Sequence, residues 1–334
     1  MFMESPALKH RDETFDIIKG MCILLMIVGH CDLPIVLHKI IYSFHMPIFF
    51  IVAGYFAREQ SLKRNVFSGI RRLIIPYLMV YAICYTFTFF LRDAVSNNNF
   101  FVFVLAENDS SNILPVFDCQ RFPVWFLVAL FWCRVAFDFI LRIKNDVFKL
   151  ILCILVPLLA VNLYVYVKLP FSFLTGLSAV GFYAMGSFLK RMNFQENKRI
   201  WKNFPVFLSA WFVCFFSTGT LAIWRNAYNG FYILDCLGAL AIFLILYIVV
   251  EKGKTDNRMW NFLKWCGVNS LIILCVHAIE FNFINYPYVK TVLTRCFLWY
   301  SVYVVILLRL IIDIVLAFLL SKSFIVRKYI FAQE

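Results

Sequence analysis

The sequence predicts an all-α, polytopic membrane protein with about ten transmembrane helices. Of its 334 residues, 63% are hydrophobic and 15% are charged, against about 45–50% and about 25% in a typical soluble domain. A soluble chain of this length could not bury so much apolar surface, because only part of a domain is core. The composition therefore excludes a soluble enzyme, a disordered chain and a disulfide scaffold, and it makes the lipid bilayer the expected solvent.

Ten apolar segments are long enough to cross a hydrocarbon core about 30 Å thick, which takes about 20 helical residues. They run near 15–31, 40–57, 73–92, 122–141, 147–167, 171–189, 204–224, 231–250, 266–286 and 296–320. The second segment contains Pro47, which is tolerated in a first helical turn. Neither an internal repeat nor a Gly/Ser linker divides the sequence, so we expect a single integral membrane domain over residues 1–334.

Charges in the loops predict that both termini lie in the cytoplasm. With that orientation the cytoplasmic segments hold 22 of the 32 Lys and Arg residues and the outer segments hold 7, while Lys19, Arg134 and Arg309 lie within spans. This split is the positive-inside pattern of a multi-pass protein of the cell membrane. It explains the net charge of +13 without a nucleic-acid partner. The longest loop, roughly 93–121, is then outside, either as a lid over an external site or as a solvated connector.

Three ionisable residues lie in the first predicted span. Eleven residues separate Lys19 from His30, which is almost three helical turns, so both lie on one face about 16 Å apart along the axis. Asp16 precedes Lys19 by three residues and is placed to pair with it. Ionisable groups within a membrane are costly and often functional. The alternative for this face is a snorkelling lysine and an interfacial histidine.

Two more histidines are expected on the outer side. His45 follows His30 after a short loop, so both imidazoles could reach one cavity, where a histidine can take a proton from a hydroxyl and return it to a leaving group. His277 and Glu280 share one face of the ninth span, and the carboxylate could orient the imidazole. The structural alternatives are a cap or interface contact for His45 and a self-satisfied buried pair for His277 and Glu280.

The remaining charges at the spans have simpler interpretations. Arg134 with Asp138, and Arg309 with Asp313, are spaced as self-neutralising pairs, and we expect them to be structural. At the cytoplasmic start of the third span, the adjacent residues 71 and 72 are both arginine. They could bind phosphate oxygens or serve only the charge bias. The sequence lacks a Gly-rich phosphate loop and tandem metal-ligand spacings, so no metal is expected.

Short motifs follow one another in a specific order along the chain. They are Asp16-x-x-Lys19-Gly20, Val28-Gly29-His30, Phe44-His45-Met46-Pro47-x-Phe49-Phe50, Ala53-Gly54-Tyr55, Arg71-Arg72-Leu73, Pro76-Tyr77, Val124-Trp125-Phe126-Leu127 and a late His277. In this order the chain resembles the acyltransferase-3 family of integral membrane acyltransferases, and within it the fucose 4-O-acetylase-like bacterial branch. The resemblance covers essentially the whole chain, and the first 80 residues are its most specific part.

The resemblance implies one membrane acyltransferase domain over 1–334 that moves an acetyl group from acetyl-CoA to a hydroxyl of a cell-surface or lipid-linked sugar. The family's signature of a basic residue and a histidine eleven positions later matches Lys19 and His30. Arg is common at the first of these positions. Some relatives carry R-x-x-R where this chain has two adjacent arginines. The implied roles are catalytic for His30, His45 and His277, donor-binding for Lys19, Arg71 and Arg72, and supporting for Asp16, Trp125 and Glu280.

Other functions fit parts of the pattern. One is acyl transfer to a non-glycan acceptor such as a lipid, and another is transfer to a peptidoglycan sugar. A transporter or exporter with a histidine proton relay would also use intramembrane charges, although the paired broken helices of many transporters are not evident in the sequence. A membrane module that senses or scaffolds without catalysis is a further alternative.

Overall fold

The regular structure in the residues that the computed structural model describes is helical, apart from one isolated antiparallel bridge between Ala222 and Ala227. The described residues are 12–58, 61–92, 123–197, 202–228, 231–284, 286–297, 300–324 and 326–331. The predicted outer loop at 93–121 lies outside them. The all-α, polytopic membrane architecture predicted from the composition is confirmed.

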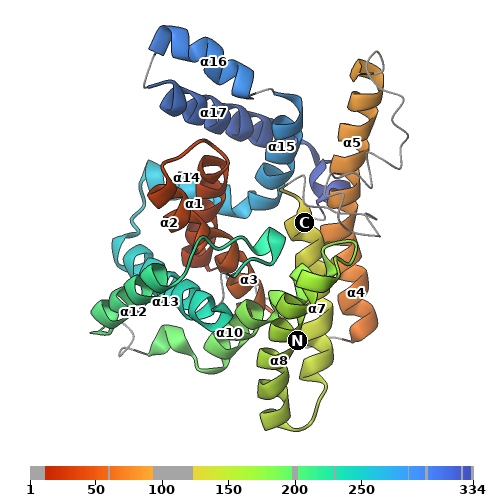
Figure 1. Cartoon of the computed structure of the whole chain (residues 1–334), viewed down its shortest axis with the longest axis vertical. Coiled ribbons are helices and arrows are strands. Elements are labelled where there is room, and N and C mark those ends of the chain that lie inside the picture. The colour runs from red at the N-terminus through yellow and green to blue at the C-terminus, as the bar shows by residue number, and fades with distance from the viewer. Residues whose placement is uncertain are drawn as a thin grey trace, which may run out of the picture.

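Figure 1 shows the arrangement of the helices, which differ widely in length. In chain order they are α1 (Glu13–Gly29), α2 (Ile35–Tyr42), α3 (His45–Tyr55), α4 (Leu62–Gly69), a π-helical turn (Ile70–Ile74), α5 (Ile75–Arg92), α7 (Trp125–Leu141), α8 (Asp146–Tyr166), α9 (Phe173–Ser178), α10 (Val180–Arg191), α12 (Phe204–Ser217), α13 (Tyr232–Gly253), α14 (Arg258–Val268), α15 (Ser270–Phe283), α16 (Tyr286–Phe297) and α17 (Ser301–Lys322).

Within the described ranges, five helical segments are long and apolar enough to cross a membrane. They are Ile35–Tyr55, Leu62–Cys84, Asp146–Tyr166, Tyr232–Gly253 and Ser301–Lys322. A sixth consists of α14 and the first part of α15, which meet at a 75° bend and form either a broken span or a re-entrant loop. Helices α1 and α7, with 17 residues each, lie at the lower limit of spanning length. The count of ten spans stays a prediction.

Several of the predicted segments have different boundaries in the structure. The third, for example, belongs to a helical stretch that begins at Leu62 instead of 73. The second begins as α2 and restarts as α3 at His45, and the ninth breaks at Asn269, whose side chain donates to the carbonyl of Trp265 at 3.0 Å. The seventh ends at Ser217 instead of continuing to 224. Each break coincides with a short polar interruption of an otherwise apolar run, namely Ser43, Ser217-Thr218-Gly219-Thr220 and Asn269-Ser270. The length of the apolar run was therefore a poor guide to where each helix ends.

Helix α1 is central, with α2, α3, α13, α14, α15 and α17 packed around it. Its closest neighbour is α14, because Gly20 lies against the backbone of Leu263 and Gly267 lies against the backbone of Asp16, closer than any side chain would allow. Small residues permit such close crossings between membrane helices. This contact fixes the orientation of α1 and leaves its Lys19–His30 face toward the cavities described below.

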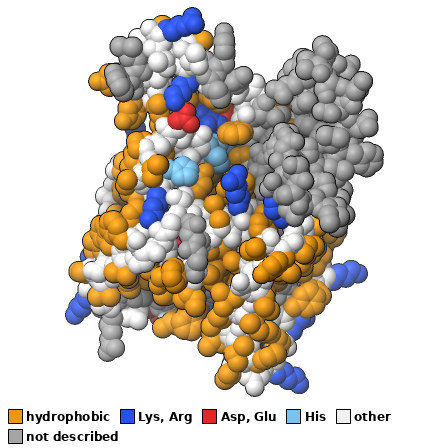
Figure 2. Space-filling model, in the orientation of Figure 1, with side chains coloured by type: hydrophobic (Ala, Val, Ile, Leu, Met, Phe, Trp, Pro, Cys, Tyr) orange, Lys and Arg blue, Asp and Glu red, His pale blue; other side chains and the backbone are white. Residues whose placement is uncertain are grey.

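Other helices present apolar surface outward. Helices α8 and α17 are only slightly buried in the protein and carry many exposed aliphatic and aromatic side chains. Hydrophobic side chains cover most of the described part of the face drawn in Figure 2. Such a surface matches lipid contact rather than contact with water.

Candidate active site

Two adjoining cavities lie along one face of α1. The middle cavity, about 280 Å³, is lined by Lys19, Ile23 and Met26, and the histidine cavity, about 30 Å³, is lined by Met26 and His30. These α1 positions are three or four residues apart, so they form one continuous stripe. Met26, Met46 and Leu274 line both cavities and so form the partition between them.

A larger cavity of about 840 Å³ adjoins the middle one and is strongly basic. It shares Ala53, Phe56 and Leu130 with the middle cavity. Four arginines are among its lining residues, namely Arg58, Arg64, Arg72 and Arg134. Arg71 is exposed and is not among the described residues that line this cavity. The three cavities share lining residues and so lie in series between an arginine-lined surface and the histidines along α1.

Two imidazoles line the histidine cavity from different helices. His30 caps the C-terminus of α1, and its Nδ1 lies 2.9 Å from the carbonyl oxygen of Met26. His45 begins α3, and its Nδ1 lies 2.8 Å from the carbonyl oxygen of Ile41. A carbonyl oxygen only accepts hydrogen bonds, so each Nδ1 carries the hydrogen and each Nε2 keeps the lone pair. Two potential proton acceptors therefore share one cavity, with Trp125 in its wall.

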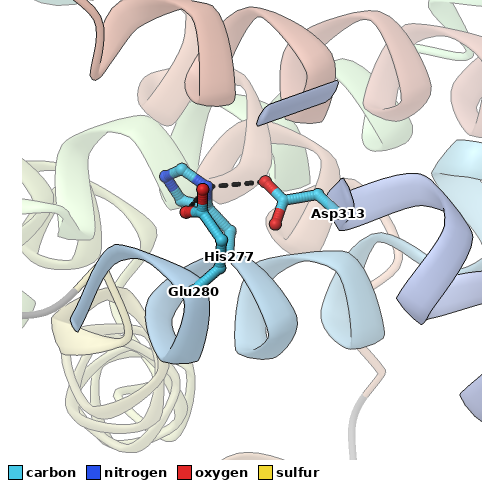
Figure 3. Close-up of side chains that lie close together, drawn as sticks. All are labelled: His277, Glu280 and Asp313. Atoms are coloured by element: carbon cyan, nitrogen blue, oxygen red, sulfur yellow. Dashed lines mark hydrogen bonds and ion pairs between the residues drawn. The ribbon is translucent and has the colours of Figure 1, made fainter. Parts of the chain in front are cut away.

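Behind His30 lies a buried group of ionisable side chains. The Nδ1 of His277 lies 2.7 Å from an oxygen of Asp313 and 3.7 Å from an oxygen of Glu280, and Figure 3 shows both carboxylates near this nitrogen. The Nε2 of His277 lies 3.3 Å from the Nδ1 of His30. His277 and Asp313 are both 0% exposed. The ninth and tenth predicted spans thus contribute to the same site as the first.

Arg309 ties this group to the end of α1. Its guanidinium donates to the carbonyl of His30 at 2.9 Å and to Glu280 at 3.3 Å, and it stacks on the ring of Tyr286 at 4.1 Å. A positive group at the C-terminal carbonyls of a helix is favoured by the helix dipole. Arg309 therefore holds the backbone of His30 in place from α17.

The predicted self-neutralising pairs have separate partners in the structure. Arg309 pairs with Glu280, whereas Asp313 pairs with His277. Arg134 donates to Asn65 and Ser68, whereas Asp138 accepts from Arg142. The expectation that Arg309 and Asp313 only neutralise each other is therefore wrong in its pairing. Their position in a membrane span was the available signal, since intramembrane ions commonly mark functional sites.

The other predicted residues lie as follows. Asp16 and Lys19 form the expected ion pair at 2.7 Å. Tyr42 and Trp224, which no motif in the sequence marks, also line the histidine cavity beside Trp125. Trp224 lies in the short turn Ile223–Arg225, in a region predicted to be helical, so its approach to the cavity follows from the early end of α12.

His277, Glu280 and Asp313 also form a potential metal-binding group, because their ligand atoms lie within 4.8 Å of one another. One imidazole and two carboxylates suit several divalent metals. A metal there would have to share Glu280 with the guanidinium of Arg309, which lies 3.3 Å away. The positive charge in contact with this group is thus supplied by the protein itself.

Comparison with known proteins gives two relatives and one family. The nodulation protein NolL of Sinorhizobium fredii is 36% identical over 22% of this chain and 24% of its own length. NolL of Mesorhizobium japonicum is 29% identical over 26% of each chain. The matched part therefore spans about a quarter of these relatives. No solved structure matches the chain. A family model described as an acyltransferase domain matches residues 12–321, which include all three cavities and the buried ionisable group, and the chain accordingly belongs to this acyltransferase family.

Proposed function

We propose that this membrane acyltransferase is an O-acetyltransferase of the cell membrane, which moves an acetyl group from acetyl-CoA to a hydroxyl of a cell-surface or lipid-linked sugar. The observation that supports it most is the series of cavities along α1, which runs from arginines through an apolar middle to two imidazoles. The chemistry of the cavities changes in the same order as that of acetyl-CoA, from anionic phosphates through a long arm to a reactive thioester.

The donor would bind from the arginine end, which the charge bias places in the cytoplasm. Guanidinium groups form charge-assisted, often bidentate hydrogen bonds with phosphate oxygens, so the basic cavity suits the nucleotide end of the donor. The middle cavity would take the arm, with Lys19 near one end and mostly apolar walls elsewhere. The thioester would then reach the partition formed by Met26, Met46 and Leu274.

The chemical step needs a base on the far side of this partition. The Nε2 of His30 takes the proton of the acceptor hydroxyl while the hydroxyl oxygen attacks the thioester carbonyl carbon. The carbon–sulfur bond breaks, and the leaving thiolate takes the proton back from the imidazolium. The carboxylates of Glu280 and Asp313 behind His30 offset the positive charge of Arg309, which also contacts this end of α1. His45, in the same cavity, would orient the acceptor or assist proton transfer.

Mass spectrometry of surface glycans and lipid-linked sugars tests this function. Cells with the wild-type protein should carry an acetyl ester that is absent without the protein and absent with His30→Ala. Identical glycans in all three strains would contradict a sugar acceptor. Acetyl-CoA consumption with the ester on a lipid instead would indicate a non-glycan acceptor. Transport of an unmodified solute without acetyl-CoA consumption would favour the transporter.

A further inference from the structure

His277 contacts Asp313 on one side of its ring and the proposed base, His30, on the other. We propose that Asp313 is a positioning residue which, through His277, fixes the ring nitrogen of His30 that carries the hydrogen. The inference rests on the proposed function, in which His30 accepts the proton of the acceptor hydroxyl. This inference gives a role to Asp313, a buried carboxylate within a predicted membrane span.

The direction of this chain of hydrogen bonds follows from its fixed end. The Met26 carbonyl oxygen, 2.9 Å from His30 Nδ1, can only accept, so Nδ1 of His30 carries a hydrogen. Nε2 of His277 lies 3.3 Å from the same Nδ1, so a second, longer hydrogen bond there would share this hydrogen with the Met26 carbonyl. Two N–H groups cannot face each other in this way, so Nε2 of His277 has the lone pair. Its hydrogen is therefore on Nδ1, which donates to Asp313 at 2.7 Å.

The carboxylate that accepts from His277 is Asp313 and not Glu280, although Glu280 is nearer in the sequence. Glu280 lies three residues after His277 on α15, but its oxygen is 3.7 Å from the imidazole and it accepts from Arg309. Asp313 comes from α17, which packs against α15. The two carboxylates therefore have different partners, since Glu280 on α15 binds Arg309 and Asp313 on α17 binds His277.

This arrangement matters most when His30 is protonated. A proton on Nε2 makes the ring an imidazolium, whose Nδ1–H then donates into His277 and, through it, toward the carboxylate of Asp313. Aligned hydrogen bonds in a low-dielectric interior strengthen one another. Reversing the tautomer of His277 would place an N–H against the Nδ1–H of His30 and oppose the charged state. No proton needs to pass to Asp313.

Nitrogen-15 NMR of histidine-labelled protein tests the inference without substrate, because the chain has five histidines. In the wild type, His30 and His277 should both show the Nδ1–H tautomer. In Asp313→Ala, His277 should populate the Nε2–H form and kcat for acetyl transfer should fall about 100-fold. This is less than the ~10⁴-fold loss when a carboxylate orients the base directly, because Met26 still holds His30. The KM for acetyl-CoA should not change.

Three further variants keep the test decisive. Asp313→Glu retains a carboxylate and should partly restore both the Nδ1–H tautomer of His277 and kcat. Asp313→Asn preserves the side-chain volume and replaces the alanine variant if that variant does not fold. Asp235→Ala removes another buried aspartate, on α13 and outside this group, and should leave the tautomers and kcat unchanged. Wild-type tautomers in Asp313→Ala would overturn the inference, whatever the activity. The expected tautomer change in a protein that transfers no acetyl group would reject the proposed function and retain the hydrogen-bond chain.

Discussion

Neighbouring arginines on the π-helical turn differ in what they face. Both are exposed, but Arg72 lines the basic cavity and Arg71 is not among the described residues that line it. Removing one charge-assisted hydrogen bond to phosphate costs about 1.5–3 kcal/mol, so Arg72→Gln should raise the Kd of acetyl-CoA about tenfold or more. Arg71→Gln makes the same change of charge and should have little effect. Calorimetry on the purified protein measures both. Equal weakening by both would mean that the arginines act only through the general surface charge.

The group formed by His277, Glu280 and Asp313 gives a separate prediction on metals. Because Arg309 contacts this group as a positive charge, we expect acetyl transfer to survive prolonged dialysis against a chelator. Elemental analysis of the dialysed protein is the control that any bound metal has been removed. Activity that disappears with the metal and returns with a divalent ion would show that the three side chains are ligands instead.

At the scale of helices, the partition between the middle and histidine cavities should determine which acyl group is transferred. Met46 comes from α3 and Met26 from α1, and both line the two cavities. Met46→Ala would enlarge the space at the proposed thioester, so butyryl-CoA should gain relative to acetyl-CoA. One methylene in an apolar site is worth about 10-fold or more in kcat/KM.

Met21→Ala is the matched control for this change. Met21 lies on α1, is partly buried, and does not belong to the described residues that line either cavity. Its donor selectivity should equal that of the wild type. If Met46→Ala loses activity toward all donors in proportion, the partition does not select the acyl chain.

The sequence predicted the helices better than the positions where they break and the partners of their buried charges. Composition and charge were enough for the membrane architecture, and the spacing of Lys19 and His30 correctly placed both on one helix face. The break at Asn269 was not predicted, because the polar pair Asn269-Ser270 is short and lies between apolar residues. The partners of Arg309 and Asp313 were also missed, since an i, i+4 spacing suggests a local pair while packing of α17 on α15 and α1 supplies nearer ones.

At the scale of the whole molecule, the charge bias predicts which side each loop faces. Cys296 is exposed and lies at the predicted outer end of the tenth span, whereas Lys63 lies in a segment predicted to be cytoplasmic. In a Cys119→Ser background, a membrane-impermeant maleimide should label Cys296 in intact cells and should not label it after Cys296→Ser. In the protein that carries both Cys119→Ser and Cys296→Ser, a cysteine introduced by Lys63→Cys should react with the maleimide only after the cells are permeabilised. Labelling of that site in sealed cells would invert the topology.

The role of His30 connects the cavities, the buried charges and the proposed chemistry, so its substitution is the most direct test. Wild-type protein and His30→Ala should be compared in vesicles with acetyl-labelled CoA and the sugar acceptor, together with donor affinity and thermal midpoint. Loss of a general base typically costs about 10²–10⁴-fold. We expect label transfer to fall by that factor while donor binding and thermal stability stay near wild type. A stable His30→Ala protein that transfers the label at nearly the wild-type rate would contradict the mechanism.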